Sequence, residues 1–185
     1  VSIASHMLGM RYVAVPLFWL NIGFYSLLWV ITLGRLAAFP ARLASDFRDH
    51  ATGFGYLTMV AGSCILGNQF VLIAEDPPFG SALLITGAAL WLPMIYGLMV
   101  AVIAAPGKPA LKDGINGLWL LATVSTQSIS VLLTTLAPHA GDATGAALVL
   151  GAFSFMTGGL LYLLMITLIF YRLAFKEVKP ESLAP

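Results

Sequence analysis

Neutral polar side chains recur at helical spacing inside a long stretch without charge. Thr123, Gln127, Ser130 and Thr134 fall at positions i, i+4, i+7 and i+11, with Thr126 at the edge of the same stripe. On a helix this spacing places them on one face. A hydroxyl or amide facing lipid would lack a hydrogen-bond partner, so we expect this face to meet either another helix or a polar pathway.

Two other apolar stretches carry related polar faces. If all three faces border one pathway, the candidate pathway-lining residues are Ser2, Ser5, His6, Thr58, Gly62, Gln69, Thr123, Gln127, Ser130 and Thr134. Gln69 and Gln127 are the strongest single candidates, because an amide can both donate and accept a hydrogen bond to a passing solute. The alternative is that these groups only join helices, together with close-packing pairs such as Ser63 and Gly67.

The sequence offers little support for catalysis or for a bound cofactor. It contains no His-Glu-x-x-His pattern, no phosphate-binding glycine-rich loop and no carboxylate pair within an apolar stretch. His50 and His139 lie in predicted loops, so only His6 is expected at membrane depth, and one histidine cannot supply paired haem ligands. We therefore predict a protein that is not an enzyme, without cofactor or metal. A proton relay is also disfavoured, because no carboxylate lies within the apolar stretches.

The polar faces belong to segments long enough to cross a membrane. Of the 185 residues, 59% are hydrophobic and 9% charged, and the mean hydropathy is +0.94. This composition excludes a soluble domain, a disordered chain and a nucleic-acid-binding protein. The only cysteine, Cys64, excludes an intrachain disulfide. Since about 20 apolar residues span a bilayer, the charge-free stretches predict spans at 12–33, 54–74, 82–104, 118–136 and 143–171.

The segment 1–10 is apolar but only about half a span long. It is either the end of an incomplete helix or, because it contains Ser5-His6-Met7, a cloning remnant. If it is counted as a helix, the chain is an all-α integral membrane protein with six spans, of which the first is incomplete. Residues 172–185 would then form a tail. We expect residues 1–185 to form a single transmembrane domain that is a fragment of a longer chain.

The basic residues predict the orientation of these spans. Eight of the nine lie in alternate loops and in the tail, on one predicted side, and Arg11 alone lies on the other. Because short cytoplasmic loops are enriched in lysine and arginine, both ends of the chain are expected in the cytoplasm of a multi-pass cell-membrane protein.

Two motifs resemble a known family. The first is the run 46–50, Asp-Phe-Arg-Asp-His, followed by Gly-Phe-Gly-Tyr-Leu-Thr-Met-Val-Ala-Gly at 53–62 and Gly-Asn-Gln-Phe at 67–70. The second is Asn-Gly-Leu-Trp-Leu-Leu at 116–121, continuing into Val-Ser-Thr-Gln-Ser at 124–128. They resemble the tellurite-resistance/dicarboxylate transporter family, which includes plant slow anion channels and C4-dicarboxylate transporters, and the similarity extends over essentially the whole chain.

The resemblance implies ten helices, arranged as five hairpins around a central pore, with inner and outer helices alternating. It also implies small anionic substrates such as malate, chloride or nitrate, a homotrimer of full-length chains in the bilayer, and a phenylalanine gate on a ninth helix beyond this sequence. Some relatives carry a proline kink in the fifth helix, whereas residues 122–133 contain no proline. The rival hypothesis is a non-transporting membrane subunit whose polar stripes are helix contacts.

Overall fold

The computed structural model describes residues 1–175, apart from the side chains of Lys112 and Asp113, and within this part the chain is helical without strands. The elements are α1 (Ser2–Met7), α2 (Arg11–Ala38), α3 (Pro40–Arg48), η1 (Gly53–Leu57), α4 (Thr58–Leu72), α5 (Pro77–Ala104), α6 (Leu111–Gly114), η2 (Gly117–Leu120), α7 (Leu121–Leu136), η3 (Ala137–His139), η4 (Gly141–Ala143) and α8 (Thr144–Phe175). The predicted all-α fold class is confirmed.

Five helical segments are long and apolar enough to cross a membrane: Arg11–Ala38, Gly53–Leu72, Pro77–Ala104, Gly117–His139 and Gly141–Phe175. Each overlaps one of the charge-free stretches, and α1 is the half-length helix that precedes them. The helix α8 continues through Arg172 to Phe175, so it includes the first residues of the predicted tail. The remainder of that tail lies outside the described residues.

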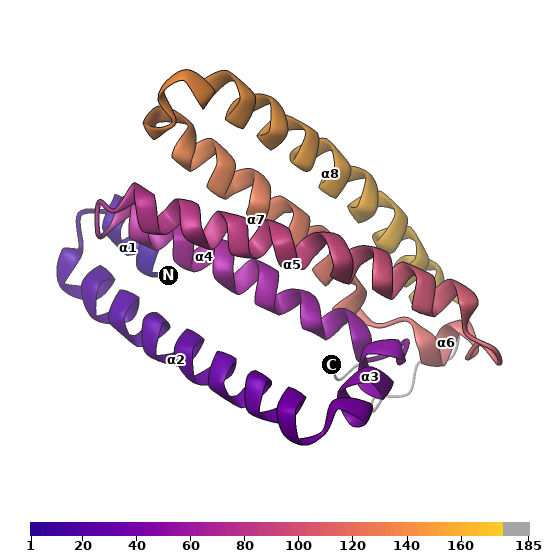
Figure 1. The fold of residues 1–185 in the computed structure, drawn as a ribbon. Helices are drawn as coiled ribbons and strands as arrows, with labels where there is room; N and C mark the ends of the chain where they lie inside the picture. Colours follow the sequence, from indigo (N-terminus) through magenta and orange to yellow (C-terminus); the bar gives the residue numbers. More distant parts are fainter. Residues whose placement is uncertain (176–185) are drawn as a thin grey trace.

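Spans that follow each other in the chain run antiparallel, and the two central helices, α4 and α7, run parallel to each other (Figure 1). α4 packs against both α5 and α7, and α7 packs against α8, while α2 contacts the rest of the bundle sparsely (Figure 1). About half of the spans that contain α4 and α7 is buried, compared with 11–17% of the spans formed by α2, α5 and α8. The described helices therefore separate into inner ones (α1, α4, α7) and outer ones (α2, α5, α8).

Helices α4 and α7 each begin with a 3-10 turn, η1 and η2, and these two turns are joined at one end of the bundle. The rings of Phe54 and Trp119 stack with their centroids 4.4 Å apart. The indole Nε1 of Trp119 donates to the carbonyl oxygens of His50 at 2.8 Å and Gly114 at 3.1 Å. Asn116 donates to the carbonyl oxygen of Ala51 at 2.9 Å, which links the same two loops. These bonds fix the starts of α4 and α7 relative to each other.

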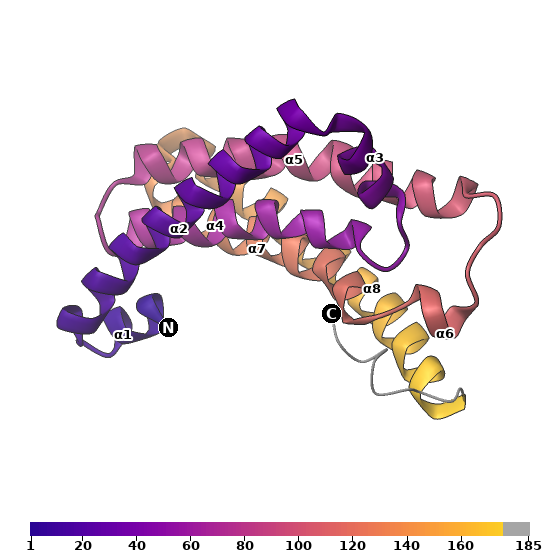
Figure 2. The same cartoon turned by 90° about the horizontal axis from the view of Figure 1, so that it is seen from below.

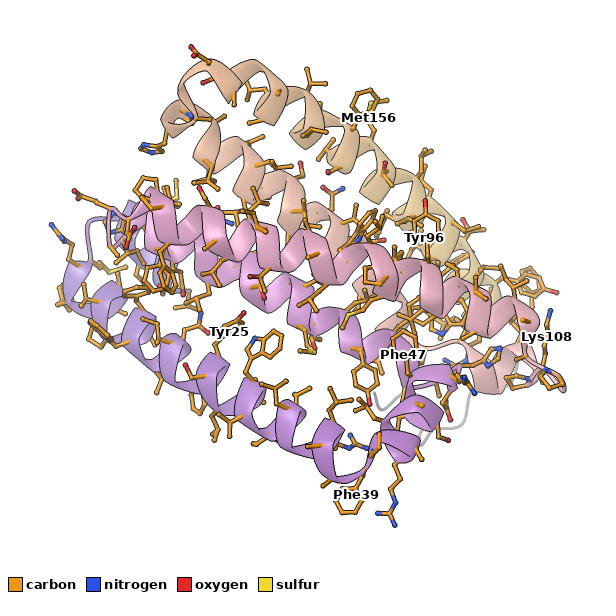
Figure 3. The ribbon with its side chains drawn as sticks, in the orientation of Figure 1. Tyr25, Phe39, Phe47, Tyr96, Lys108 and Met156 are labelled. Atoms are coloured by element: carbon orange, nitrogen blue, oxygen red, sulfur yellow. The ribbon has the colours of Figure 1, made fainter. Side chains whose placement is uncertain are left out.

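Sequence analysis did not anticipate α3, a short helix that follows α2 at the same end of the bundle (Figure 2). Pro40 supplies its first position, where the missing N–H costs nothing. The ring of Phe47 lies between α3 and the bundle, 5.8 Å from the ring of Tyr56 (Figure 3). A nine-residue amphipathic helix of this kind is typical of the membrane interface.

Small residues allow the close approach of α4, α5 and α7. A Cβ atom on Gly67 would lie 2.6 Å from Leu132 Cδ2 and 3.3 Å from Leu83 Cβ. A Cβ atom on Gly87 would lie 2.8 Å from Cys64 Sγ. In a bilayer, where helix association depends on packing because lipid is as apolar as the side chains, such contacts carry much of the stability.

We therefore expect Gly67→Val in the full-length protein to destabilise the fold by about 1–3 kcal/mol, because the added methyl groups overpack the contact with α5 and α7. Gly23→Val is the matched control, since a Cβ atom on Gly23 in α2 meets nothing within 4 Å. Thermal unfolding in detergent measures both. Equal effects of the two substitutions would contradict this account of the packing.

Candidate functional site

The three inner helices border a groove of about 490 Å³. Its lining residues are Ile3, Met7, Ile65, Asn68, Leu72, Thr123, Val124, Gln127, Ser128, Val131 and Thr135. These residues come from α1, α4 and α7, and none of them is charged. The groove is thus a neutral, partly polar surface within the described part of the chain, and it runs along the inner helices.

Two polar atoms in this groove lack hydrogen-bond partners among the described residues. They are the side-chain oxygen Oδ1 of Asn68 and the hydroxyl Oγ1 of Thr123. Both residues are buried, with 4% and 8% exposure. The amide nitrogen of Asn68 donates to the carbonyl oxygen of Cys64 at 2.9 Å, which fixes the orientation of that side chain. A buried polar group without a partner is costly, so these two atoms leave hydrogen-bonding capacity beside the groove for a partner beyond the described residues.

The predicted stripe on α7 divides between this groove and the contact with α8. Thr123 and Gln127 line the groove, and Gln127 also donates from Nε2 to the carbonyl oxygen of Phe155 at 3.0 Å. Ser130 is turned toward α8, where its hydroxyl donates to the carbonyl oxygen of Gly151 at 2.7 Å. Thr134 donates to the carbonyl oxygens of its own helix.

The predicted stripe on α4 faces α2 and α1 instead of the groove. Asn21 Nδ2 donates to Gln69 Oε1 at 2.6 Å, and Gln69 Nε2 donates to Ser2 Oγ at 2.9 Å. Gln69 therefore connects α1, α2 and α4 through a single side chain. Gly62 lies nearest to Tyr25 of α2, and the exposed Thr58 donates to the carbonyl oxygen of Gly55.

The α1 candidates lie close to this junction. Ser5, like Ser2, is 5% exposed, and His6 is half-buried with its Nδ1 atom unpartnered among the described side chains. Ser5 and His6 are not among the residues that line the groove. The predicted residues thus form two separate groups. Ser2 and Gln69 lie at the junction of α1, α2 and α4, and Thr123 and Gln127 line the groove.

Several lining residues escaped the sequence prediction. Ser128 and Thr135 lie seven positions apart on α7, interleaved with Val124 and Val131 on the same groove face. Their spacing can be seen in the sequence, but it is less evident than the neighbouring stripe that begins at Thr123 and ends at Thr134. Asn68 is not among the predicted lining residues, although it lines the groove and the predicted Gln69 does not.

The described residues contain no cluster of three or more histidine, cysteine, aspartate or glutamate side chains that could hold a metal ion. What the groove offers to a solute is therefore hydrogen bonding by hydroxyl and amide groups and contact with apolar side chains.

Together, the apolar spans define a multi-pass helical membrane protein with a neutral groove along its inner helices. The family described as "SLAC1: Voltage-dependent anion channel" matches residues 1–185. The chain belongs to this family, which confirms the resemblance inferred from the two motifs.

Two curated relatives come from the archaeon Methanocaldococcus jannaschii. The chain is 22% identical over 183 residues to the uncharacterized transporter MJ0576, covering 98% of this chain and 52% of the relative. It is 21% identical over 170 residues to the uncharacterized transporter MJ0762, covering 91% of this chain and 49% of the relative. The chain thus spans about half the length of these relatives. No solved structure gives a significant match.

The contrast between Thr123 and Ser130 predicts opposite responses to losing a hydroxyl. Thr123→Val in the full-length protein should leave thermal stability unchanged or raise it, because it removes a buried hydroxyl that has no partner among the described residues. Ser130→Ala should cost about 0.6–1.7 kcal/mol, because it removes the bond to Gly151. A loss of stability for Thr123→Val as large as that for Ser130→Ala would mean that Thr123 has a partner elsewhere in the protein.

Proposed function

We propose that the full-length protein transports small anions across the membrane along a pathway of which α1, α4 and α7 form one wall. The observation that carries this proposal is the neutral groove on these helices, whose lining residues include Thr123 with its buried, unpartnered hydroxyl. Membership of the anion-channel family supports it. The whole activity belongs to the longer protein, since the curated relatives are about twice the length of this chain.

The chemistry of the lining suits an anion that binds weakly. Hydroxyl and amide N–H groups, such as those of Thr123 and Gln127, can donate to an anion as it leaves water. A fixed positive charge would bind an anion tightly and slow its departure, whereas conduction requires binding weak enough for release. The described lining residues supply donors without such a charge. This combination favours passive or weakly coupled movement.

Within this proposal the predicted lining residues have two kinds of role. Thr123 and Gln127 face the solute, together with Asn68. Ser130 holds α8 against α7, Thr134 bonds within α7, and Gln69 joins α4 to Ser2 of α1 and Asn21 of α2. Ser5, His6, Thr58 and Gly62 belong to the same supporting region, on the sides of α1 and α4 that lie outside the groove.

Three finer features complete the proposal. The substrates are small inorganic anions such as chloride or nitrate, tellurite-related oxyanions, or C4-dicarboxylates such as malate. The full-length chains assemble as a homotrimer. The end of the bundle that carries α3 and α6 faces the cytoplasm of the cell, because that end carries the described basic residues Arg35, Arg42, Arg48, Lys108 and Arg172.

The rival function is that of a non-transporting membrane subunit. The bonds of Ser130 to α8 and of Gln69 to α1 and α2 favour it, because they show polar residues of the predicted stripes serving as helix contacts. The two functions predict different effects on anion flux when a groove residue is substituted and the helix contacts stay intact.

Anion flux into proteoliposomes containing the full-length protein separates these functions. We expect flux of at least one of chloride, nitrate and malate, and a change of about two- to tenfold on Thr123→Val, the effect of one hydrogen bond of about 0.5–1.5 kcal/mol. Gln127→Leu should also alter conductance or selectivity.

Thr167→Val is the matched control, because Thr167 lies exposed on α8 and its hydroxyl donates within its own helix. It should leave flux unchanged. Absence of flux for all three anions under every condition would contradict the transport proposal. Equal flux in the wild-type, Thr123→Val and Gln127→Leu proteins would show that the groove is not part of the pathway.

A further inference from the structure

A second and larger cavity lies away from the inner groove, between the outer helices α2 and α5. It measures about 600 Å³ and is closed at one end by α3. The residues that line it are mostly apolar: Trp29, Thr32, Leu33, Leu36, Pro40, Leu43, Ala44, Phe47, Arg48, Tyr56, Met59, Leu90, Met94, Gly97, Val100 and Ala101. We call it the α2–α5 cleft. It shares only helix α4 with the inner groove, and no lining residue.

The cleft arises from the way α2 is attached. At one end, Asn21 and Tyr25 bond to Gln69 and Ser63 of α4, at 2.6 Å and 2.8 Å. Beyond Tyr25 the helix diverges from the bundle, as Figure 1 and Figure 3 show, and it returns only through α3. There Phe47 packs on α5, with its Cε1 atom 3.3 Å from the Cβ position of Gly97.

Such a space cannot stay empty, and water does not suit it. Its volume corresponds to about 20 water molecules at about 30 Å³ each. Water in a cavity needs polar partners, and most of this lining is hydrocarbon. Both walls are membrane-spanning helices, so the cleft lies at the depth of the lipid chains. The occupant therefore brings a long apolar group.

The α3 end of the cleft adds positive charge. Arg48 is exposed and lines the cleft. Neither Arg48 nor Arg42 forms an ion pair with any described residue, whereas Arg35 pairs with Asp46. That pairing reduces the repulsion that Asp46 would exert on an anion. Asp49, the other carboxylate of this turn, accepts from the backbone nitrogen of Ala51 at 2.6 Å. An arginine at the mouth of an apolar cleft between spans suits a lipid phosphate.

We propose that the α2–α5 cleft binds an anionic phospholipid, with an acyl chain between α2 and α5 and the headgroup phosphate at Arg48. The lipid fills the gap between α2 and α5, and it holds α3 at the membrane surface. This site is independent of the transport proposal, because it lies on the outer helices and takes a structural lipid.

Native mass spectrometry of the full-length protein tests the site. The protein is equilibrated with palmitoyl-oleoyl phosphatidylglycerol or with the zwitterionic phosphatidylcholine, and the lipid retained per chain is counted. We expect preferential retention of phosphatidylglycerol, and a loss of about fivefold in that retention for Arg48→Gln, as befits one arginine near the surface. Arg42→Gln is the matched control, since Arg42 lies on the same helix, contacts Phe39 and does not line the cleft.

A second pair of variants tests the acyl-chain part. Ala101→Trp should fill the cleft and reduce retention of both lipids, whereas Ala89→Trp, on the exposed face of the same helix, should not. Unfolding temperatures of the variants show that they remain folded. Unchanged phosphatidylglycerol retention in both Arg48→Gln and Ala101→Trp would overturn the proposal. So would a disulfide-linked dimer formed through Val100→Cys but not Ala89→Cys, because it would place a second copy in the cleft.

Discussion

The structure depends on one constraint: a polar group inside the hydrocarbon layer must find its hydrogen-bond partner within the protein. The described intramembrane polar side chains meet it either by bonding to the backbone of their own helix, as Thr86 and Ser128 do, or by joining helices. Trp91 donates to Thr126 at 2.9 Å, Ser130 bonds to the backbone of α8, and Gln69 connects three helices. The hydroxyl of Thr123 and the amide oxygen of Asn68 do not meet it among the described residues, and both lie in the inner groove.

The same constraint explains why inner and outer helices differ. α4 and α7 are covered on several sides, so they carry both the polar contacts and the small residues that permit close packing. α2, α5 and α8 expose large apolar side chains to lipid and use few polar bonds. Where an outer helix diverges, as α2 does beyond Tyr25, no described side-chain bond joins it to α4 or α5, and an apolar space opens that lipid can enter.

Much of the fold was predictable because the signal is a property of single segments. Charge-free stretches of about 20 residues indicate spanning helices whatever their neighbours are. The short helix α3 was missed, because nine residues with three charges resemble a loop by composition. Of the site, only Thr123 and Gln127 were predicted and also line the groove. Helical periodicity groups residues on a face, but it does not say which helix that face meets.

The sequence by itself determined the membrane class, the positions of the spans, the family and the neutral character of the intramembrane polar groups. These features follow from composition, local spacing and motif. Only the tertiary structure decided that Gln69 joins α1, α2 and α4, that Ser130 bonds to α8, and that Thr123 shares a groove with Asn68. The physical reason is that a hydrogen bond depends on the position of its partner, and here the partners lie 21 to 67 residues away along the chain.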